Sequence, residues 1–245
     1  MAFSPAEVER YARHLVLREI GGPGQQRLKA TSVLMVGAGG LGAPATLYLA
    51  AAGVGRIGVA DPDTVALSNL QRQVLYTAAD VGLAKVTVAA GRLTALNSDI
   101  VVEPHALAVT PDNAATLVAG YDLVLDGTDD FATRFAVSDA CVSAGKTLVS
   151  GAIARWTGQV GVFPGRPCYR CLVPGIPPDA DTCARVGVVG ALGGVIGSMM
   201  ALEAIKVITG AGEPLSGRLL IYDALAGETR TVRIGSDPGC PACHA

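Results

Sequence analysis

The stretch Thr31-Ser-Val-Leu-Met-Val36-Gly37-Ala-Gly-Gly-Leu-Gly42 decides the fold of this chain. Its first half is a short run of apolar and β-branched residues, which predicts a buried strand. Its second half spells Gly-x-Gly-x-x-Gly, with Gly37, Gly39 and Gly42 at the fixed positions and Gly40 between them. A glycine turn between a strand and a helix lets backbone N–H groups approach a phosphate closely. We therefore predict a nucleotide-binding turn here.

Short apolar strands and helices alternate after this turn. Further strands are predicted at 56–60, 100–103, 123–126 and 147–150, and helices at 42–52, 85–96, 113–119 and 132–144. This alternation predicts an α/β, Rossmann-like fold with a doubly wound, mostly parallel sheet covered on both faces. Beyond Ser150, strands at 158–163, 218–222 and 229–234 predict that an antiparallel C-terminal half continues the same sheet.

The chain is expected to form a single domain over residues 1–245. Within it we distinguish an N-terminal helical segment (1–30), a nucleotide-binding half (31–150) and a second half (151–245). In the N-terminal segment, a helix from 5 to about 20 is expected to stop at the Gly21-Gly-Pro-Gly24 break, since glycine and proline interrupt helices.

The composition argues against several classes of function. The net charge of −2 provides no general basic surface, so we expect no nucleic-acid partner. The N-terminus lacks the basic-then-apolar pattern of a secretory signal, which favours a cytoplasmic location. Residues 187–202 carry no charge, but this run has only 16 residues, five of them glycine, and Glu203 and Lys206 follow. We predict a buried helix there rather than a membrane span.

Polar and charged residues follow the ends of the predicted strands. A carboxylate after the second strand usually accepts hydrogen bonds from ribose hydroxyls. An Arg and a Lys beyond it can neutralise a triphosphate, and carboxylates after a further strand can hold Mg²⁺. The candidate nucleotide-binding residues are Gly37, Gly39, Gly40, Gly42, Asp61, Asp63, Ser68, Asn69, Leu70, Gln71, Arg72, Gln73, Lys85, Asp129 and Asp130.

Each charged candidate also has a simpler structural interpretation. Asp129 or Asp130 could cap a helix that begins near residue 131, Lys85 could be an ordinary solvated lysine, and Arg72 could pair with a nearby aspartate. The joint placement of these residues at successive strand ends favours a triphosphate site. An NAD-linked oxidoreductase would not use these charged residues. A catalytically silent nucleotide-binding scaffold would have no physical need for all of them.

Four of the six cysteines form two Cys-x-x-Cys pairs, Cys168 with Cys171 and Cys240 with Cys243. Two such pairs suit a tetrahedral Zn²⁺ site, which would be structural because no ligand position stays open. Residues 240–244 also spell a c-type haem attachment motif, and a disulfide or redox dithiol is a further alternative. Zinc is favoured because the haem interpretation leaves the first pair unexplained.

The two remaining cysteines differ from each other. Cys141 stands in a predicted helix and is expected to be a buried apolar residue. Cys183 precedes the long apolar helix close to Arg185, where an exposed thiolate could act as a nucleophile.

Together these motifs resemble the HesA/MoeB/ThiF family, the prokaryotic relatives of ubiquitin-activating enzymes, and within it the molybdopterin-synthase adenylyltransferase branch. The resemblance covers nearly the whole chain. It rests on residues 37–42, 61–65 and 68–73, Lys85, Thr128-Asp129, Arg10-Tyr-Ala-Arg13 and the two cysteine pairs. Two positions depart from the family pattern: His14 replaces a common Gln and Asp130 a common Asn.

The resemblance implies an adenylyltransferase that uses ATP and Mg²⁺ and contains Zn²⁺. Its implied substrate is the C-terminal Gly-Gly carboxylate of a ubiquitin-like sulfur carrier, bound by the second half of the chain, ahead of thiocarboxylate formation in molybdopterin biosynthesis. Carriers for thiamine, cysteine or tRNA thiolation stay open. A homodimer and a separate sulfur donor, a rhodanese or a cysteine desulfurase, are implied partners.

The resemblance also assigns roles to individual residues. Asp61 would bind ribose, Asn69, Arg72 and Lys85 the phosphates, and Asp129 would position Mg²⁺. Arg13 would reach the ATP site of the neighbouring subunit. The implied catalytic set is Arg13, Arg72, Lys85 and Asp129. Cys183 matches a cysteine that links covalently to the carrier in thiamine-branch enzymes. Because both reactants are anions, we expect a positively charged crevice.

Overall fold

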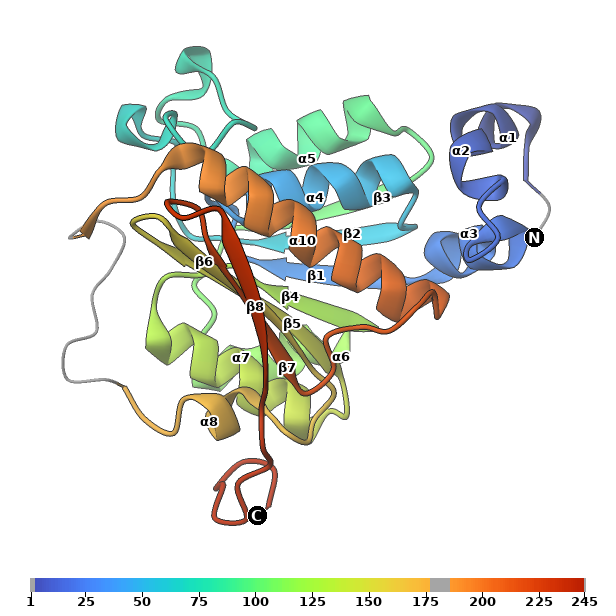
Figure 1. The fold of residues 1–245 in the computed structure, drawn as a ribbon. Coiled ribbons are helices and arrows are strands. Elements are labelled where there is room, and N and C mark those ends of the chain that lie inside the picture. The colour runs from blue at the N-terminus through green and yellow to red at the C-terminus, as the bar shows by residue number, and fades with distance from the viewer. Residues whose placement is uncertain (1–2, 177–185, 245) are drawn as a thin grey trace.

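A single mixed sheet of eight strands organises the protein. The computed structural model describes residues 3–176 and 186–244. The strand order is β3-β2-β1-β4-β5-β6-β7-β8 (Figure 1). The strands are β1 (Ser32–Val36), β2 (Arg56–Ala60), β3 (Val101–His105), β4 (Leu123–Asp126), β5 (Thr147–Ala154), β6 (Thr157–Phe163), β7 (Arg218–Asp223) and β8 (Glu228–Arg233). Strands β1 to β5 pair in parallel, and β5 to β8 pair antiparallel, which confirms the predicted change of rhythm after Ser150.

Helices cover both faces of the sheet (Figure 1). One face carries α4 (Gly42–Ala52), α5 (Lys85–Leu96) and α10 (Gly190–Thr209), and the other carries α6 (Pro111–Ala119), α7 (Phe131–Ser143) and the short α8 (Tyr169–Leu172). Strand β1 feeds both cores because successive side chains point to opposite faces. Val33 and Met35 belong to the core beneath α4 and α10, whereas Leu34 and Val36 belong to the core beneath α6 and α7.

The long apolar helix α10 lies along α4 and across β5 and β6 (Figure 1). Among the described residues it is the one helix long and apolar enough to cross a membrane by length and composition. Its Ile196 and Met200 side chains are fully buried on the sheet. The prediction of a buried helix is confirmed on that face, although the helix continues to Thr209, beyond the uncharged run.

The expected break at residues 21–24 is wrong, because these residues begin helix α3 (Gly21–Ala30). The first N–H groups of a helix have no partner within it, so Pro23 costs no hydrogen bond in the first turn. The segment before it forms two short helices, α1 (Pro5–Arg10) and α2 (Ala12–Leu15), separated at Tyr11.

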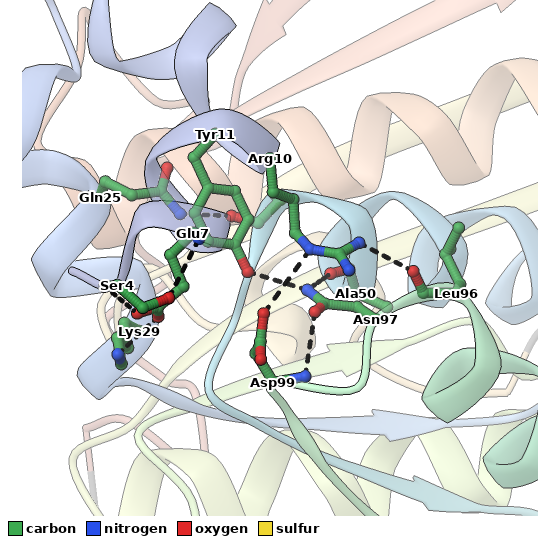
Figure 2. Close-up of polar contacts among 11 residues, drawn as sticks. Ser4, Glu7, Arg10, Tyr11, Gln25, Lys29, Ala50, Leu96, Asn97 and Asp99 are labelled. Atoms are coloured by element: carbon green, nitrogen blue, oxygen red, sulfur yellow. Dashed lines mark hydrogen bonds and ion pairs between the residues drawn. The ribbon is translucent and has the colours of Figure 1, made fainter.

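Polar contacts fasten the N-terminal helices to the body of the protein (Figure 2). The amide nitrogen of fully buried Asn97 donates to Tyr11 Oη at 2.9 Å and to the carbonyl of Ala50 at 2.7 Å. Arg10 Nη1 donates to the carbonyl of Leu96 at 3.0 Å. The Tyr11 ring fills the space beside Gly53, where a Cβ would lie 2.5 Å from the ring, and Gly53 has φ +82°. Long-range contacts therefore fix where α1 and α2 lie.

We predict that Asn97→Ala lowers the free energy of unfolding by about 1–3 kcal/mol, because it leaves the Tyr11 hydroxyl and the Ala50 carbonyl buried without their donor. Denaturant unfolding measures this loss, and Ser98→Ala at the exposed neighbouring position is the matched control. Equal stabilities of the two variants would show that the contact contributes nothing.

Candidate active site

The main cavity opens at the carboxyl ends of the parallel strands and has a volume of about 610 Å³. It lies where the strand order reverses, since β1 pairs with β2 on one side and β4 on the other. Ligands of doubly wound folds bind in this crevice. The predicted residues that line it are Gly37, Gly39, Gly40, Asp61, Asp63, Asn69, Arg72, Gln73, Lys85, Asp129 and Asp130.

The glycine turn is compact on its inner side and open toward the cavity. A Cβ built on Gly42 would lie 1.9 Å from the carbonyl oxygen of Gly37, so a side chain there would separate β1 from α4. Gly39 and Gly40 have no protein atom closer than 3.5 Å to such a Cβ. Their missing side chains leave room for a ligand to reach the backbone N–H groups, as a phosphate requires.

Asp61 holds the glycine turn in shape. Its two carboxylate oxygens accept the Ala38 N–H at 2.8 Å and the Asp63 N–H at 2.9 Å. From the other side, the Tyr76 hydroxyl donates to the Ala38 carbonyl at 2.8 Å. Burial, aided by the Asp61 charge, raises the pKa of Tyr76, so its hydroxyl stays protonated and able to donate. Sequence reasoning missed Tyr76, because no motif distinguishes it from a core aromatic residue.

Lys85 is not a solvated lysine, and that simpler interpretation is wrong. Its side chain is 5% exposed, and Nζ lies 2.8 Å from Asp63 Oδ2 and 3.8 Å from Asp61 Oδ1. As the first residue of α5 it would oppose the positive end of the helix dipole, and the two carboxylates offset this.

Arg72 does not pair with Asp61 or Asp63, so its own simpler interpretation also fails. Its Nη1 donates to the carbonyl of Ser68 at 3.0 Å, and within the described residues it forms no ion pair. Its aliphatic carbons lie against Gly40, since a Cβ there would be 3.6 Å from Arg72 Cγ. The guanidinium therefore stands at the cavity wall beside the glycine turn.

The two aspartates after β4 have different tasks. Asp130 is the N-cap of α7, accepting the Thr133 N–H at 2.7 Å and the Ala132 N–H at 3.4 Å. Partial burial raises the pKa of Asp130, but these hydrogen bonds outweigh burial and hold the pKa below its usual value. Asp129 lines the cavity, and among the described residues its carboxylate forms no hydrogen bond or ion pair, although its charge acts on Arg134. The capping interpretation thus applies to Asp130.

A buried arginine that sequence reasoning missed supports the Asp129 turn. Arg134 of α7 is 5% exposed, and its Nη2 donates to the carbonyls of Thr128 and Gly151. Its Nη1 lies 3.8 Å from Asp126 Oδ2, forming a buried ion pair. The only signal in the sequence is a basic residue within the otherwise mostly apolar first half of α7.

The cavity is not cationic on its own, which differs from expectation. Among the described residues, four aspartates line it, Asp61, Asp63, Asp129 and Asp130, against three cations, Arg72, Lys85 and Arg134. Arg134 is occupied by backbone carbonyls, and Lys85 by Asp63. These described side chains alone do not neutralise a polyanion.

Several predicted residues lie away from the cavity wall. Gly42 is packed beneath the turn, and Ser68, Leu70 and Gln71 do not line the cavity. Arg13 is exposed on α2. Figure 1 places α2 near the start of β1, at the end of the strands opposite the cavity. Cys183 falls outside the described residues.

The four paired cysteines meet at one place. Their sulfur atoms lie within 4.8 Å of one another, with Cys168 and Cys240 3.5 Å apart and Cys171 and Cys243 also 3.5 Å apart. All four cysteines are free thiols, and both separations exceed the S–S distance of about 2.05 Å in a disulfide. Tetrahedral Zn²⁺ with Zn–S bonds of about 2.3 Å places sulfurs roughly 3.8 Å apart, so the cluster fits this ion.

The cluster lowers the pKa of one of its thiols, and its geometry also bears on the haem interpretation. Burial alone would raise the pKa of Cys240, but the N–H groups of Cys243 and Ala242 and the thiol of Cys168 outweigh burial and lower this pKa to about 7. The haem interpretation does not account for the first pair facing the second. Cys141 is buried and apart from this cluster, as predicted.

Comparison with known proteins identifies the family, because the profile of the ThiF family matches residues 11–242. This chain belongs to the ThiF family. A sulfur carrier protein adenylyltransferase of Thermus thermophilus is 49% identical, covering 99% of this chain and 93% of that protein. The probable adenylyltransferase/sulfurtransferase MoeZ of Mycobacterium tuberculosis is 51% identical, as is the adenylyltransferase and sulfurtransferase MOCS3 of Bos taurus.

The chain spans 63% of the length of MoeZ and 54% of the length of bovine MOCS3. Among solved structures, Escherichia coli MccB with ATP superposes with a TM-score of 0.84 at 26% identity, covering 96% of this chain and 75% of MccB. Family membership and these relatives show that the chain is an adenylyltransferase. The alternative of an NAD-linked oxidoreductase is therefore rejected.

We predict that Asp130→Ala costs about 1 kcal/mol of stability at neutral pH, whereas Asp130→Asn, an equally good cap, costs little. Because the folded-state pKa of Asp130 is lowered, its stabilising effect is present above its unfolded pKa of about 4 and disappears as pH falls through the folded value. Unfolding of both variants across acidic pH checks this. A pH-independent difference between wild type and Asp130→Ala would contradict it.

Proposed function

We propose that the protein adenylylates the C-terminal glycine carboxylate of a ubiquitin-like sulfur carrier, with ATP as donor. The carboxylate oxygen attacks the α-phosphorus, the bond to the β-phosphate oxygen breaks, and pyrophosphate leaves an acyl adenylate. The observation that carries this proposal is a glycine-turn cavity joined by Arg72, Lys85 and Asp129. It occurs in a chain 49% identical over nearly its full length to a sulfur carrier protein adenylyltransferase.

The proposed reaction needs no general base. An α-carboxyl group has a pKa of about 3.5 and is ionised at neutral pH, so the nucleophile is ready. This agrees with the absence of histidine from the cavity lining among the described residues. The task is to bring two anions together, and catalysis would then rest on in-line positioning and charge neutralisation.

The proposed phosphate contacts follow from the way the side chains are held. Asn69 Oδ1 accepts the Ala66 N–H at 3.1 Å, which leaves the amide NH₂ free to donate toward the cavity. Arg72 stands beside the glycine turn, and Lys85 is held at the wall by Asp63. Asp61, at the end of β2, is in the position of a ribose-binding carboxylate.

The charge of the cavity supports two further components of the proposed site, a Mg²⁺ ion and an arginine from a second subunit. Among the described lining residues, the four aspartates outnumber the cations that have no carboxylate partner, so a bound triphosphate requires further positive charge. Mg²⁺ held by Asp129 would supply it, because this hard cation takes oxygen ligands and bridges phosphates. Arg13, which does not line the cavity of its own chain, would enter that of a second subunit in a homodimer.

The carrier and its pathway are finer parts of the proposal. A carrier of the molybdopterin pathway, similar to MoaD, is favoured, with thiamine, cysteine and tRNA-thiolation carriers as alternatives. Residues 151–245 would bind the carrier within a single domain 1–245. A separate rhodanese or cysteine desulfurase would donate sulfur, and Cys183 could link covalently to the carrier. We place this reaction in the cytoplasm, with neither nucleic acid nor membrane as partner.

We also propose a structural Zn²⁺ held by Cys168, Cys171, Cys240 and Cys243. When bound, the ion would tie the C-terminal residues to the segment after β6. Arg166 supports the same connection, donating from Nε to the Cys243 carbonyl at 3.1 Å.

We predict that Arg72→Ala lowers carrier-dependent ATP–pyrophosphate exchange by about 10²–10³-fold, because a charge opposite the phosphates is lost in the transition state. Exchange is measured with each candidate carrier in turn. Arg92→Ala is the control, since Arg92 pairs with Asp80 outside the cavity. No exchange by the wild-type protein with any carrier would refute the proposed function, and full activity of Arg72→Ala would remove that residue from it.

We predict that the purified protein contains one zinc ion per chain and that Cys240→Ser releases it and lowers the melting temperature. Elemental analysis and thermal unfolding measure both effects. Cys141→Ala, which alters a buried cysteine outside the cluster, keeps the ion. A wild-type protein without zinc after purification in zinc-containing medium would contradict the assignment.

A further inference from the structure

Three glycines on one face of α10 touch the backbone of the nucleotide-binding elements. They are Gly190, Gly193 and Gly197, and we call them the α10 glycine seam. A Cβ built on Gly190 would lie 2.1 Å from the Gln71 carbonyl oxygen. The corresponding distances are 2.7 Å from Gly193 to the Gly40 oxygen and 2.5 Å from Gly197 to the Leu41 oxygen. A carbon and an oxygen need roughly 3.3 Å even in a C–H···O contact, so no side chain fits at these three positions.

The seam contacts two parts of the proposed phosphate site at once. Gly193 and Gly197 meet the turn between β1 and α4, whose residues Gly40 and Leu41 line the cavity. Gly190 meets Gln71, which directly precedes Arg72 in the chain. The aliphatic part of Arg72 in turn lies against Gly40. The start of α10 therefore sets the position of the Arg72 segment relative to the glycine turn.

The seam also contacts peptide groups of the glycine turn. In a planar trans peptide the carbonyl and the following N–H point in opposite directions. The carbonyl oxygens of Gly40 and Leu41 lie against α10, so the N–H groups of the same two peptides, those of Leu41 and Gly42, are on the side away from these contacts. The Leu41 oxygen also accepts the Ala45 N–H at 3.2 Å. The Leu41 and Gly42 N–H groups are at the start of α4, of the kind that binds phosphate at a helix N-terminus.

We propose that the α10 glycine seam is a positioning element for ATP, holding the glycine turn and the Arg72 segment at the spacing that the phosphates require. This inference rests on the proposed function of the cavity. It adds residues 190, 193 and 197, which do not line the cavity and act only through the backbone they touch. A methyl group at Gly193 forces α10 or the turn to move by roughly half an ångström, and misplacements of about 1 Å can cost about 100-fold in rate.

The test compares Gly193→Ala with Gly194→Ala. Gly194 is on the same helix, and a Cβ there meets nothing within 4 Å, so both variants share the gain in helix propensity and only Gly193→Ala adds a clash. We expect Gly193→Ala to raise the KM for ATP and the Kd for ATP by about tenfold or more, with the KM for the carrier unchanged. Gly194→Ala is expected to match wild type.

Folding and function are kept apart by two further measurements. Gly190→Ala, at the first residue of α10, strains only the end of the helix and is the second variant, with the same expected rise in the Kd for ATP. Gly193→Ala and Gly190→Ala are both assayed at a temperature where near-ultraviolet circular dichroism shows native packing. Wild-type ATP affinity in either folded variant would overturn the inference. Calorimetric ATP binding needs no carrier, so failure of exchange in wild-type protein with normal ATP binding would count against the proposed function alone.

Discussion

The contact between the end of β1 and the start of α4 is the constraint on which the cavity depends. The Gly37 carbonyl approaches Gly42 so closely that a Cβ built on Gly42 would lie 1.9 Å from that oxygen. This lets the chain reverse within a few residues and presents the first N–H groups of α4 at the carboxyl edge of the sheet. Asp61 then accepts the Ala38 N–H and Tyr76 donates to the Ala38 carbonyl, so the peptide groups on both sides of Ala38 are held, which fixes the shape of the turn.

Backbone contact rather than side-chain packing is the recurring device around this turn. Helix α10 reaches the backbone at Gly40, Leu41 and Gln71 because its facing residues are glycines. A chain with 31 glycines and only 4% aromatic residues can bring elements this close. The loss of helix propensity at each glycine is about 1 kcal/mol, and the buried apolar residues on the rest of that face of α10 offset it.

The electrostatics of the cavity is a balance rather than an excess of positive charge. Lys85 and Arg134 are buried beside carboxylates, of which Asp61 and Asp126 are buried and Asp63 is exposed, and each cation is held in one place by its partners. Removing one partner of such a pair is destabilising, because it leaves the other charge buried without a counter-charge. Among the described residues that line the cavity, Arg72 and Asp129 form no ion pair, and they are the charges suited to contact a phosphate and a metal ion.

The sequence by itself determined the elements whose signal is local. Strands β2 and β4 and helix α5 have the predicted bounds, because short apolar runs reflect strands buried on both faces and helical periodicity reflects a helix buried on one. The sequence also predicted the glycine turn, the carboxylates at the strand ends and the paired cysteines, since each is a short motif with fixed spacing.

Only the tertiary structure decided which residue takes which partner. It made Lys85, not Arg72, the ion-pair partner of Asp63, and Asp130, not Asp129, the cap of α7. It also began a helix at Gly21-Gly-Pro-Gly24 and brought Tyr76, Arg134 and the α10 glycine seam to the site. The physical reason is that these outcomes depend on hydrogen bonds, ion pairs and close approaches between segments distant along the chain. Local periodicity and propensity carry no information about such contacts.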